Sequence, residues 1–134
     1  MKILSLACTR FSYLPTTPLL DAAAAIAGRP ERVTVHDALV LLCTVEQGDS
    51  PSQVRRAADR VHRLAESAGL KAVVVDAFAH LSAKLATPAS VVDRLAILAE
   101  HLAPLEIHTA PFGWQKELSF DVTAERWSHH LITT

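Results

Sequence analysis

The sequence predicts a single α/β domain in which short β-strands alternate with two main helices. The chain has 134 residues, which is inside the usual size range of one domain and enough to bury a core without disulfide or metal staples. Half of the residues are apolar and a fifth are charged, a balance typical of globular proteins. Short, nearly continuous apolar runs alternate with two longer segments of helical periodicity. We therefore expect one domain over residues 1–134.

The N-terminal segment predicts a strand, then a loop and a short helix. Residues 3–9 form a short apolar run that ends at Arg10, as a buried strand does. Pro15 and Pro18 punctuate the stretch that follows and predict a loop. Residues 19–27 predict a short helix that a glycine ends.

A second strand is expected in the next segment. Residues 32–35 and 38–45 have the composition of strands, and His36 with Asp37 predicts a turn between them. The second of these runs is almost entirely apolar, which is typical of a strand covered on both faces. We therefore place it in the centre of the sheet.

The clearest element is a helix over residues 51–68. Ser50 is a typical N-cap, Pro51 fits the first helical position, and Gln53 completes a capping box. Gly69 is placed to end the helix. Apolar residues recur at helical spacing and turn the charged residues toward water. The arginines of this helix alternate with acidic residues, so we interpret them as a solvated face rather than as contacts for nucleic-acid phosphates.

The second half of the chain continues the alternation of strand and helix. Residues 72–75 predict a short buried strand, and Thr87 with Pro88 opens a second helix that ends before a proline. Residues 105–109 and the alternating residues 118–122 complete the predicted sheet.

Composition excludes several classes of function. The formal net charge of −1 gives a polyanion no general attraction, so nucleic acid would have to bind at a local patch or a recognised end. Cys8 and Cys43 lie within apolar runs and predict buried reduced thiols, which favours a cytoplasmic location. No window reaches the roughly 20 apolar residues of a membrane span, so we expect no membrane partner. The histidines and Ser82 lack the partners of a zinc site or a catalytic triad, so no metal or cofactor is expected.

Two segments have compositions that core packing does not explain, and each lies where a predicted strand ends and a loop begins. They are Phe-Ala-His-Leu-Ser over residues 78–82 and Ala-Pro-Phe-Gly-Trp-Gln-Lys over residues 110–116. Their order and separation resemble the archaeal-type N-terminal editing domain of threonyl-tRNA synthetase. Residues 37–46, where an acidic residue precedes a hydrophobic strand ending Val-Glu, extend this resemblance.

The resemblance implies a fold and an activity. The fold is a D-aminoacyl-tRNA deacylase-like, single-domain mixed β-sheet with two main helices. The activity is hydrolysis of serine wrongly attached to threonine tRNA, assisted by the 2′-hydroxyl of the tRNA and acting in trans if the domain is freestanding. The partners so implied are the 3′ end of tRNA, threonyl-tRNA synthetase and a second copy in a homodimer.

The resemblance also assigns site residues. Lys116 and His80 match the catalytic positions of the family. Residues at substrate-binding positions are Val45, Ala77, Ala79, Phe112, Trp114 and Gln115. An ammonium at Lys116 suits an ester hydrolysis, because the attack develops negative charge on oxygen. The near-neutral pKa typical of histidine would let His80 orient a hydroxyl or a water in either protonation state.

Two positions depart from the family pattern and keep other functions open. Gln115 stands where related sequences often carry an aromatic residue, and His129 stands where a glutamate is expected. One alternative is a D-aminoacyl-tRNA deacylase, which the same kind of fold supports. The other is a non-catalytic module that binds tRNA or a synthetase.

Overall fold

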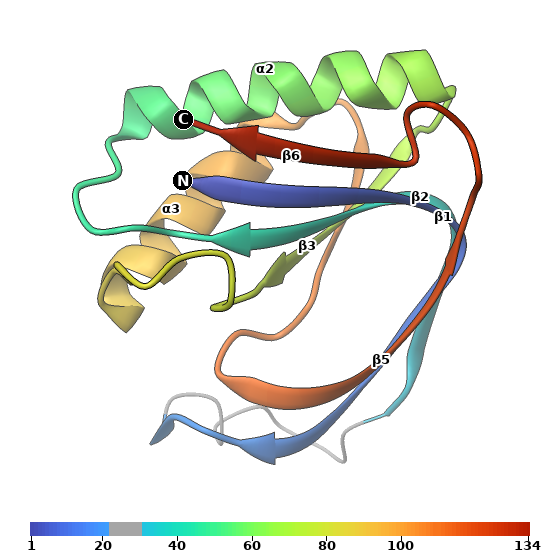
Figure 1. Cartoon of the computed structure of the whole chain (residues 1–134). Helices are drawn as coiled ribbons and strands as arrows, with labels where there is room; N and C mark the ends of the chain where they lie inside the picture. The colour runs from blue at the N-terminus through green and yellow to red at the C-terminus, as the bar shows by residue number, and fades with distance from the viewer. Residues whose placement is uncertain (22–30) are drawn as a thin grey trace.

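The computed structural model describes residues 1–21 and 31–134, which form one curved sheet with two helices on one face (Figure 1). The strands are β1 (Lys2–Pro18), β2 (Val33–Thr44), β3 (Ala72–Ala77), β4 (Glu106–Thr109), β5 (Trp114–Val122) and β6 (His129–Thr133), and the helices are α2 (Pro51–Ala68) and α3 (Pro88–His101). Of the helix predicted over residues 19–27, residues 19 and 20 are not helical, and residues 22–27 lie outside the described part of the chain.

The sheet is mixed, as predicted. Its strand order is β4-β3-β2-β1-β5, and β6 pairs with the first part of β1. β2, β3 and β4 run parallel, whereas β1 is antiparallel to each of its neighbours. β2 lies in the centre, which confirms the position inferred from its apolar sequence.

The boundaries of α2 confirm the helix predicted from its caps. The Ser50 hydroxyl accepts a hydrogen bond from the Gln53 N–H, and the Gln53 side chain accepts one from the Ser50 N–H at 2.8 Å. Gly69 ends the helix with a φ of 66°, a conformation that glycine adopts without steric penalty. Both ends of the element are therefore encoded locally.

Two hydrophobic clusters lie on opposite faces of the sheet. The first joins the inner faces of α2 and α3 to β1, β2 and β3, with Val54, Leu98 and Leu41 fully buried. The second includes Phe11, Val74 and other residues of β1, β2, β3 and β5, so on that face the curved sheet packs against itself. Figure 1 shows β5 and the second half of β1 turning away from the helices.

The prediction that the first strand ends before a loop at Pro15 and Pro18 is wrong, because β1 continues to Pro18. Beyond Tyr13, β1 has no register partner in β2, and within residues 1–21 and 31–134 it pairs only with β5. A proline, which lacks an N–H, is tolerated in a strand that no second described strand pairs with at that position.

The predicted turn at His36 and Asp37 is also wrong, because β2 is continuous through both residues. Asp37 has a φ of 51°, and it is left out of the ladder opposite Thr9 of β1. At this break the side chains that face the second core cluster shift by one residue in both strands, from Cys8 to Phe11 in β1 and from Val35 to Ala38 in β2. The backbone does depart from regular strand geometry at Asp37, but the strand continues through it and no turn forms.

The C-terminal strand β6 was not predicted from the sequence. It pairs with β1 from Lys2 to Leu6, and Ile132 contributes to the first core cluster. The cysteines, in contrast, are as predicted: Cys8 and Cys43 are both buried and reduced.

Candidate functional site

A cavity of about 290 Å³ lies at the carboxyl ends of the parallel strands β2 and β3. Its lining comes from the end of β2 through Val45, the end of β3 through Ala79, the start of α3, and the start of β5. The carboxyl ends of parallel strands are where α/β sheets commonly bind ligands. The fold therefore brings both loop motifs, residues 78–82 and 110–116, to one place.

Hydrogen bonds from β2 hold the chain that follows β3. The Phe78 N–H donates to the Cys43 carbonyl oxygen at 2.8 Å, and the Thr44 hydroxyl donates to the Phe78 carbonyl oxygen. Farther along, the Ala86 N–H donates to the Val45 carbonyl oxygen at 3.1 Å. The two sides of the cavity are thus fixed to each other through backbone groups.

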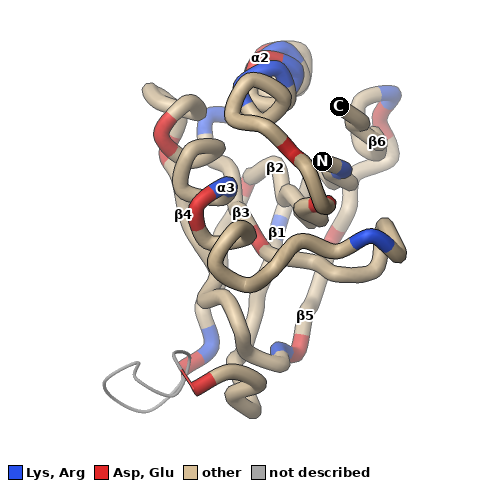
Figure 2. Tube along the Cα trace, turned by 90° about the vertical axis from the view of Figure 1, so that its left-hand side faces the viewer, with Lys and Arg blue, Asp and Glu red and all other residues tan. Residues whose placement is uncertain are grey.

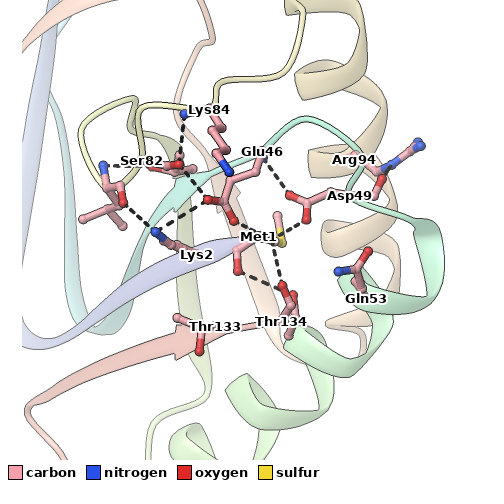
Figure 3. A network of polar contacts seen from close by, with 12 residues as sticks. Met1, Lys2, Glu46, Asp49, Gln53, Ser82, Lys84, Arg94, Thr133 and Thr134 are labelled. Carbon is pink, nitrogen blue, oxygen red and sulfur yellow. Dashed lines mark hydrogen bonds and ion pairs between the residues drawn. The ribbon is translucent and has the colours of Figure 1, made fainter.

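A charged network fastens the same loop from outside the cavity (Figure 3). The Ser82 hydroxyl donates to Glu46 Oε1 at 2.6 Å, and Lys2 Nζ lies 3.5 Å from the same oxygen. The Met1 ammonium lies 3.3 Å from Glu46 Oε2 and also pairs with the buried carboxylate of Asp49. The Ser82 hydrogen bond, together with these cations, lowers the pKa of Glu46. Glu46 therefore stays ionised and ties Ser82 to the end of β2.

Lys116 forms a buried ion pair with Asp76. Lys116 Nζ lies 2.8 Å from Asp76 Oδ1, and the two side chains are 6% and 1% exposed. Nζ donates a hydrogen bond to the Pro111 carbonyl oxygen at 3.0 Å. Its approach to Oδ1 lacks hydrogen-bond geometry, and Oδ1 has no donor among the residues that the structure describes. The contact is therefore an ion pair in a nearly water-free setting.

Burial governs the protonation of the groups around this pair. Burial raises the pKa of Asp76, while the positive charge of Lys116 opposes that rise. Burial also raises the pKa of Cys43 and of Tyr13, and the negative charge of Asp76 adds to both shifts. Cys43 and Tyr13 therefore remain neutral near pH 7.

The structure brings six of the eight predicted site residues together. The cavity is lined by Lys116, Val45, Ala77, Ala79, Phe112 and Trp114. His80 and Gln115 are not among the lining residues, and both are exposed. The His80 ring stands edge-on to Phe78 with ring centroids 5.0 Å apart. Gln115 alternates with Trp114 and Lys116 along β5, which turns its side chain to the other face of the strand.

Three polar residues at or near the cavity were given no role by the sequence analysis. They are Thr44, Glu46 and Asp76. Asp76 had a recognisable signal, since a lone acidic residue in the apolar strand Ala-Val-Val-Val-Asp-Ala is almost never fully buried without a partner. Thr44 and Glu46 act through hydrogen bonds to a distant loop, for which the sequence offers no spacing rule.

The basic residues of α2 agree with a solvated helix face. The arginines at positions 55, 56, 60 and 63 are exposed, as are Asp59 and Glu66 of the same helix. Figure 2 shows basic and acidic positions side by side on α2. Within residues 1–21 and 31–134, no group of three or more histidine, cysteine or acidic side chains is arranged to hold a metal ion. No helix in the described part of the chain is long and apolar enough to cross a membrane.

Comparison with known proteins gives relatives in archaeal aminoacyl-tRNA synthesis. A threonine–tRNA ligase of Cenarchaeum symbiosum is 34% identical over 91% of this chain and 19% of its own length, and one of Thermofilum pendens is 38% identical over 90% and 20%. A threonine–tRNA ligase editing subunit of Aeropyrum pernix is 34% identical over 89% of this chain and 28% of its own. The chain thus spans about a fifth of the ligases it matches.

Two further comparisons concern the fold and the family. A solved structure of a c-Myc DNA unwinding element binding protein superposes with a TM-score of 0.73 at 12% identity, covering 100% of this chain and 99% of that one. This likeness shows a shared fold, and the predicted fold class, a single-domain mixed sheet with two main helices, is confirmed. The family profile described as the archaea-specific editing domain of threonyl-tRNA synthetase matches residues 1–131. The chain therefore belongs to the family of archaea-specific editing domains of threonyl-tRNA synthetase.

Proposed function

We propose that this domain is an editing deacylase that hydrolyses serine wrongly esterified to threonine tRNA. The observation that carries the proposal is the buried ammonium of Lys116 in the lining of the cavity, in a chain that matches the editing-domain family over residues 1–131. Attack on an ester develops negative charge on the carbonyl oxygen. A fixed ammonium that is largely shielded from water stabilises such charge more than it would in water.

The size and lining of the cavity favour a small aminoacyl group. Its volume of about 290 Å³ is at the lower end of the range of about 300–1,000 Å³ common for small-molecule pockets. Val45, Ala77 and Phe112 give part of it an apolar lining. One methyl group in such a pocket changes binding by about 1–3 kcal/mol, which corresponds to roughly 10–200-fold between serine and threonine esters.

The protein groups in the cavity favour a role for the tRNA in the chemistry. Cys43 lines the cavity, but burial raises its pKa, so it stays a thiol rather than a reactive thiolate. The Thr44 hydroxyl is engaged with the Phe78 carbonyl oxygen. Because no activated nucleophile stands among the described lining residues, we propose that the 2′-hydroxyl of the terminal adenosine assists a water molecule. His80, at the rim, would orient the ribose hydroxyls.

The proposal is tested by single-turnover hydrolysis of charged threonine tRNA with the protein in saturating excess. Seryl-tRNA should lose its amino acid at least ten times faster than threonyl-tRNA, and a terminal 2′-deoxyadenosine should slow the reaction. Faster release of D-serine than of L-serine would identify a D-aminoacyl-tRNA deacylase instead. Binding of tRNA without hydrolysis of any ester would identify a non-catalytic module. Because a related protein of Aeropyrum pernix is named an editing subunit, the assay adds the isolated domain to charged tRNA in trans.

A further inference from the structure

Asp76 and Lys116 meet although their strands are not neighbours. Asp76 lies on β3 and Lys116 on β5, and the strand order places β2 and β1 between these two strands. Their side chains nevertheless approach to 2.8 Å, because the sheet curves and closes its second face. Lys116 lines the cavity, whereas Asp76 is 1% exposed and is not among the lining residues. The carboxylate therefore reaches a ligand only through the lysine.

We propose that Asp76 is a positioning residue that keeps Lys116 protonated and leaves one N–H of its ammonium for a ligand in the cavity. A lysine ammonium carries three N–H donors. One donates to the Pro111 carbonyl oxygen at 3.0 Å, and a second side of Nζ faces Asp76. Among the described residues Nζ has no further protein acceptor, so the remaining donor is left for the cavity.

The burial of both groups makes this role necessary. A buried amine without a counter-ion loses its proton more readily, and a neutral amine stabilises developing negative charge poorly. Asp76 is the one carboxylate within 4 Å of Nζ in the described part of the chain. The other groups near Asp76, Tyr13 of β1 and Cys43 of β2, are neutral near pH 7, and burial raises the pKa of each still further above it.

Other charged groups on the adjoining elements are engaged elsewhere. Glu117, next to Lys116 on β5, is exposed and pairs with Arg32 at 3.0 Å. His80, on the loop after β3, is exposed against Phe78. Neither replaces Asp76 as the counter-ion of Lys116.

The test compares the parent protein with the Asp76→Asn variant, which keeps the size of the side chain and removes its charge. Glu117→Gln is the matched control, since it removes a carboxylate from the adjacent, outward-facing position. The protonation of Lys116 is followed by NMR of the lysine side-chain carbons, with its signal assigned by its loss in Lys116→Met. Single-turnover hydrolysis of seryl-tRNA is measured over the same pH range, with spontaneous ester hydrolysis subtracted.

We expect the titration midpoint of Lys116 to fall by about 1–3 pH units in Asp76→Asn and to stay in place in Glu117→Gln. Hydrolysis by Asp76→Asn should then decrease about tenfold for each pH unit above the new midpoint and recover below it. A purely structural role would lower the rate equally at every pH. An unchanged Lys116 midpoint would overturn the inference.

The catalytic role of Asp76 rests on the proposed deacylase function, but the experiment tests the Asp76–Lys116 relation and that function separately. A shifted Lys116 midpoint with no seryl-tRNA hydrolysis, even by the parent, would support the Asp76–Lys116 relation and reject the proposed activity. If Asp76→Asn does not fold, the reciprocal measurement uses Lys116→Met. There the carboxyl carbon of Asp76 should titrate at a higher pH than in the parent, because the opposing charge is gone. An unchanged Asp76 titration would again overturn the inference.

Discussion

Replacing Lys116 with methionine should destabilise the protein in a pH-dependent manner. Methionine keeps most of the apolar stem but leaves the carboxylate of Asp76, which is 1% exposed, without its cation. Breaking a buried ion pair from one side costs about 3–5 kcal/mol. Native domains have about 5–15 kcal/mol of unfolding free energy, so the variant should still fold.

The pH dependence follows from the raised pKa of Asp76. A carboxyl group whose pKa is higher in the folded state binds its proton more tightly there, so folding is favoured at low pH and disfavoured as pH rises through the folded pKa. Removing Lys116 raises that pKa further. Each unit by which the folded-state pKa of Asp76 rises corresponds to about 1.4 kcal/mol of unfolding free energy lost at high pH. The loss of stability in Lys116→Met should therefore be much smaller at pH 5 than at pH 8.

Urea unfolding at pH 5 and pH 8, followed by circular dichroism, measures these differences. The control is the double variant Asp76→Val with Lys116→Met, because valine already fills the neighbouring positions of β3. Replacing a buried ion pair by apolar residues is neutral or stabilising by about 1–4 kcal/mol, so this variant should regain stability at both pH values while remaining inactive. Equal losses for Lys116→Met at the two pH values, or a double variant no more stable than either single variant, would refute the reasoning.

Three further outcomes are expected. Ser82→Ala should lower the unfolding free energy at pH 7 by about 1 kcal/mol. Because the Ser82 hydrogen bond lowers the pKa of Glu46, thermal denaturation should show this difference fading as pH falls below the ordinary pKa of a glutamate and through the lowered one. His80→Ala should reduce single-turnover hydrolysis less than the roughly 10²-fold expected for Lys116→Met, since His80 lies outside the cavity lining; an equal or larger loss would give His80 the main catalytic role. Light scattering at micromolar concentration should detect a homodimer, as the family resemblance implies, and monomer alone would contradict that proposal.

Local signals predicted the elements whose ends are encoded by short-range chemistry. The capping box at Ser50 and the glycine at position 69 fixed both ends of α2. The strands were harder, because their lengths depend on partners far away in sequence. Pro15 looked like the start of a loop, yet it is compatible with β1 because β2 has already separated from that edge. β6 depends on pairing with the N-terminal end of β1, which its own five residues do not signal.

Sequence analysis could point to those residues of the candidate site that lie within the two loop motifs, but not to their distant partners. The two loop motifs contain Lys116 and a part of the cavity lining, whereas most of the lining comes from other segments. Alternation along β5 argued against Gln115 facing the same side as Lys116, but this required the position of the strand to be known first. The partner of Lys116 could not be identified, since Asp76 is 40 residues away and two strands intervene between β3 and β5.

The position of β5 at the edge of the sheet makes the site vulnerable to local opening. Among the strands of the described residues, β5 pairs with β1 and with no other, so it can separate from the sheet while α2, α3 and the parallel strands remain folded. Such an opening would carry Lys116 away from β3 and dismantle the cavity without unfolding the domain. Catalytic competence would then track the hydrogen-exchange protection of the β5 amides rather than that of the central strands, and the protein would lose its function at denaturant concentrations where most of its fold persists.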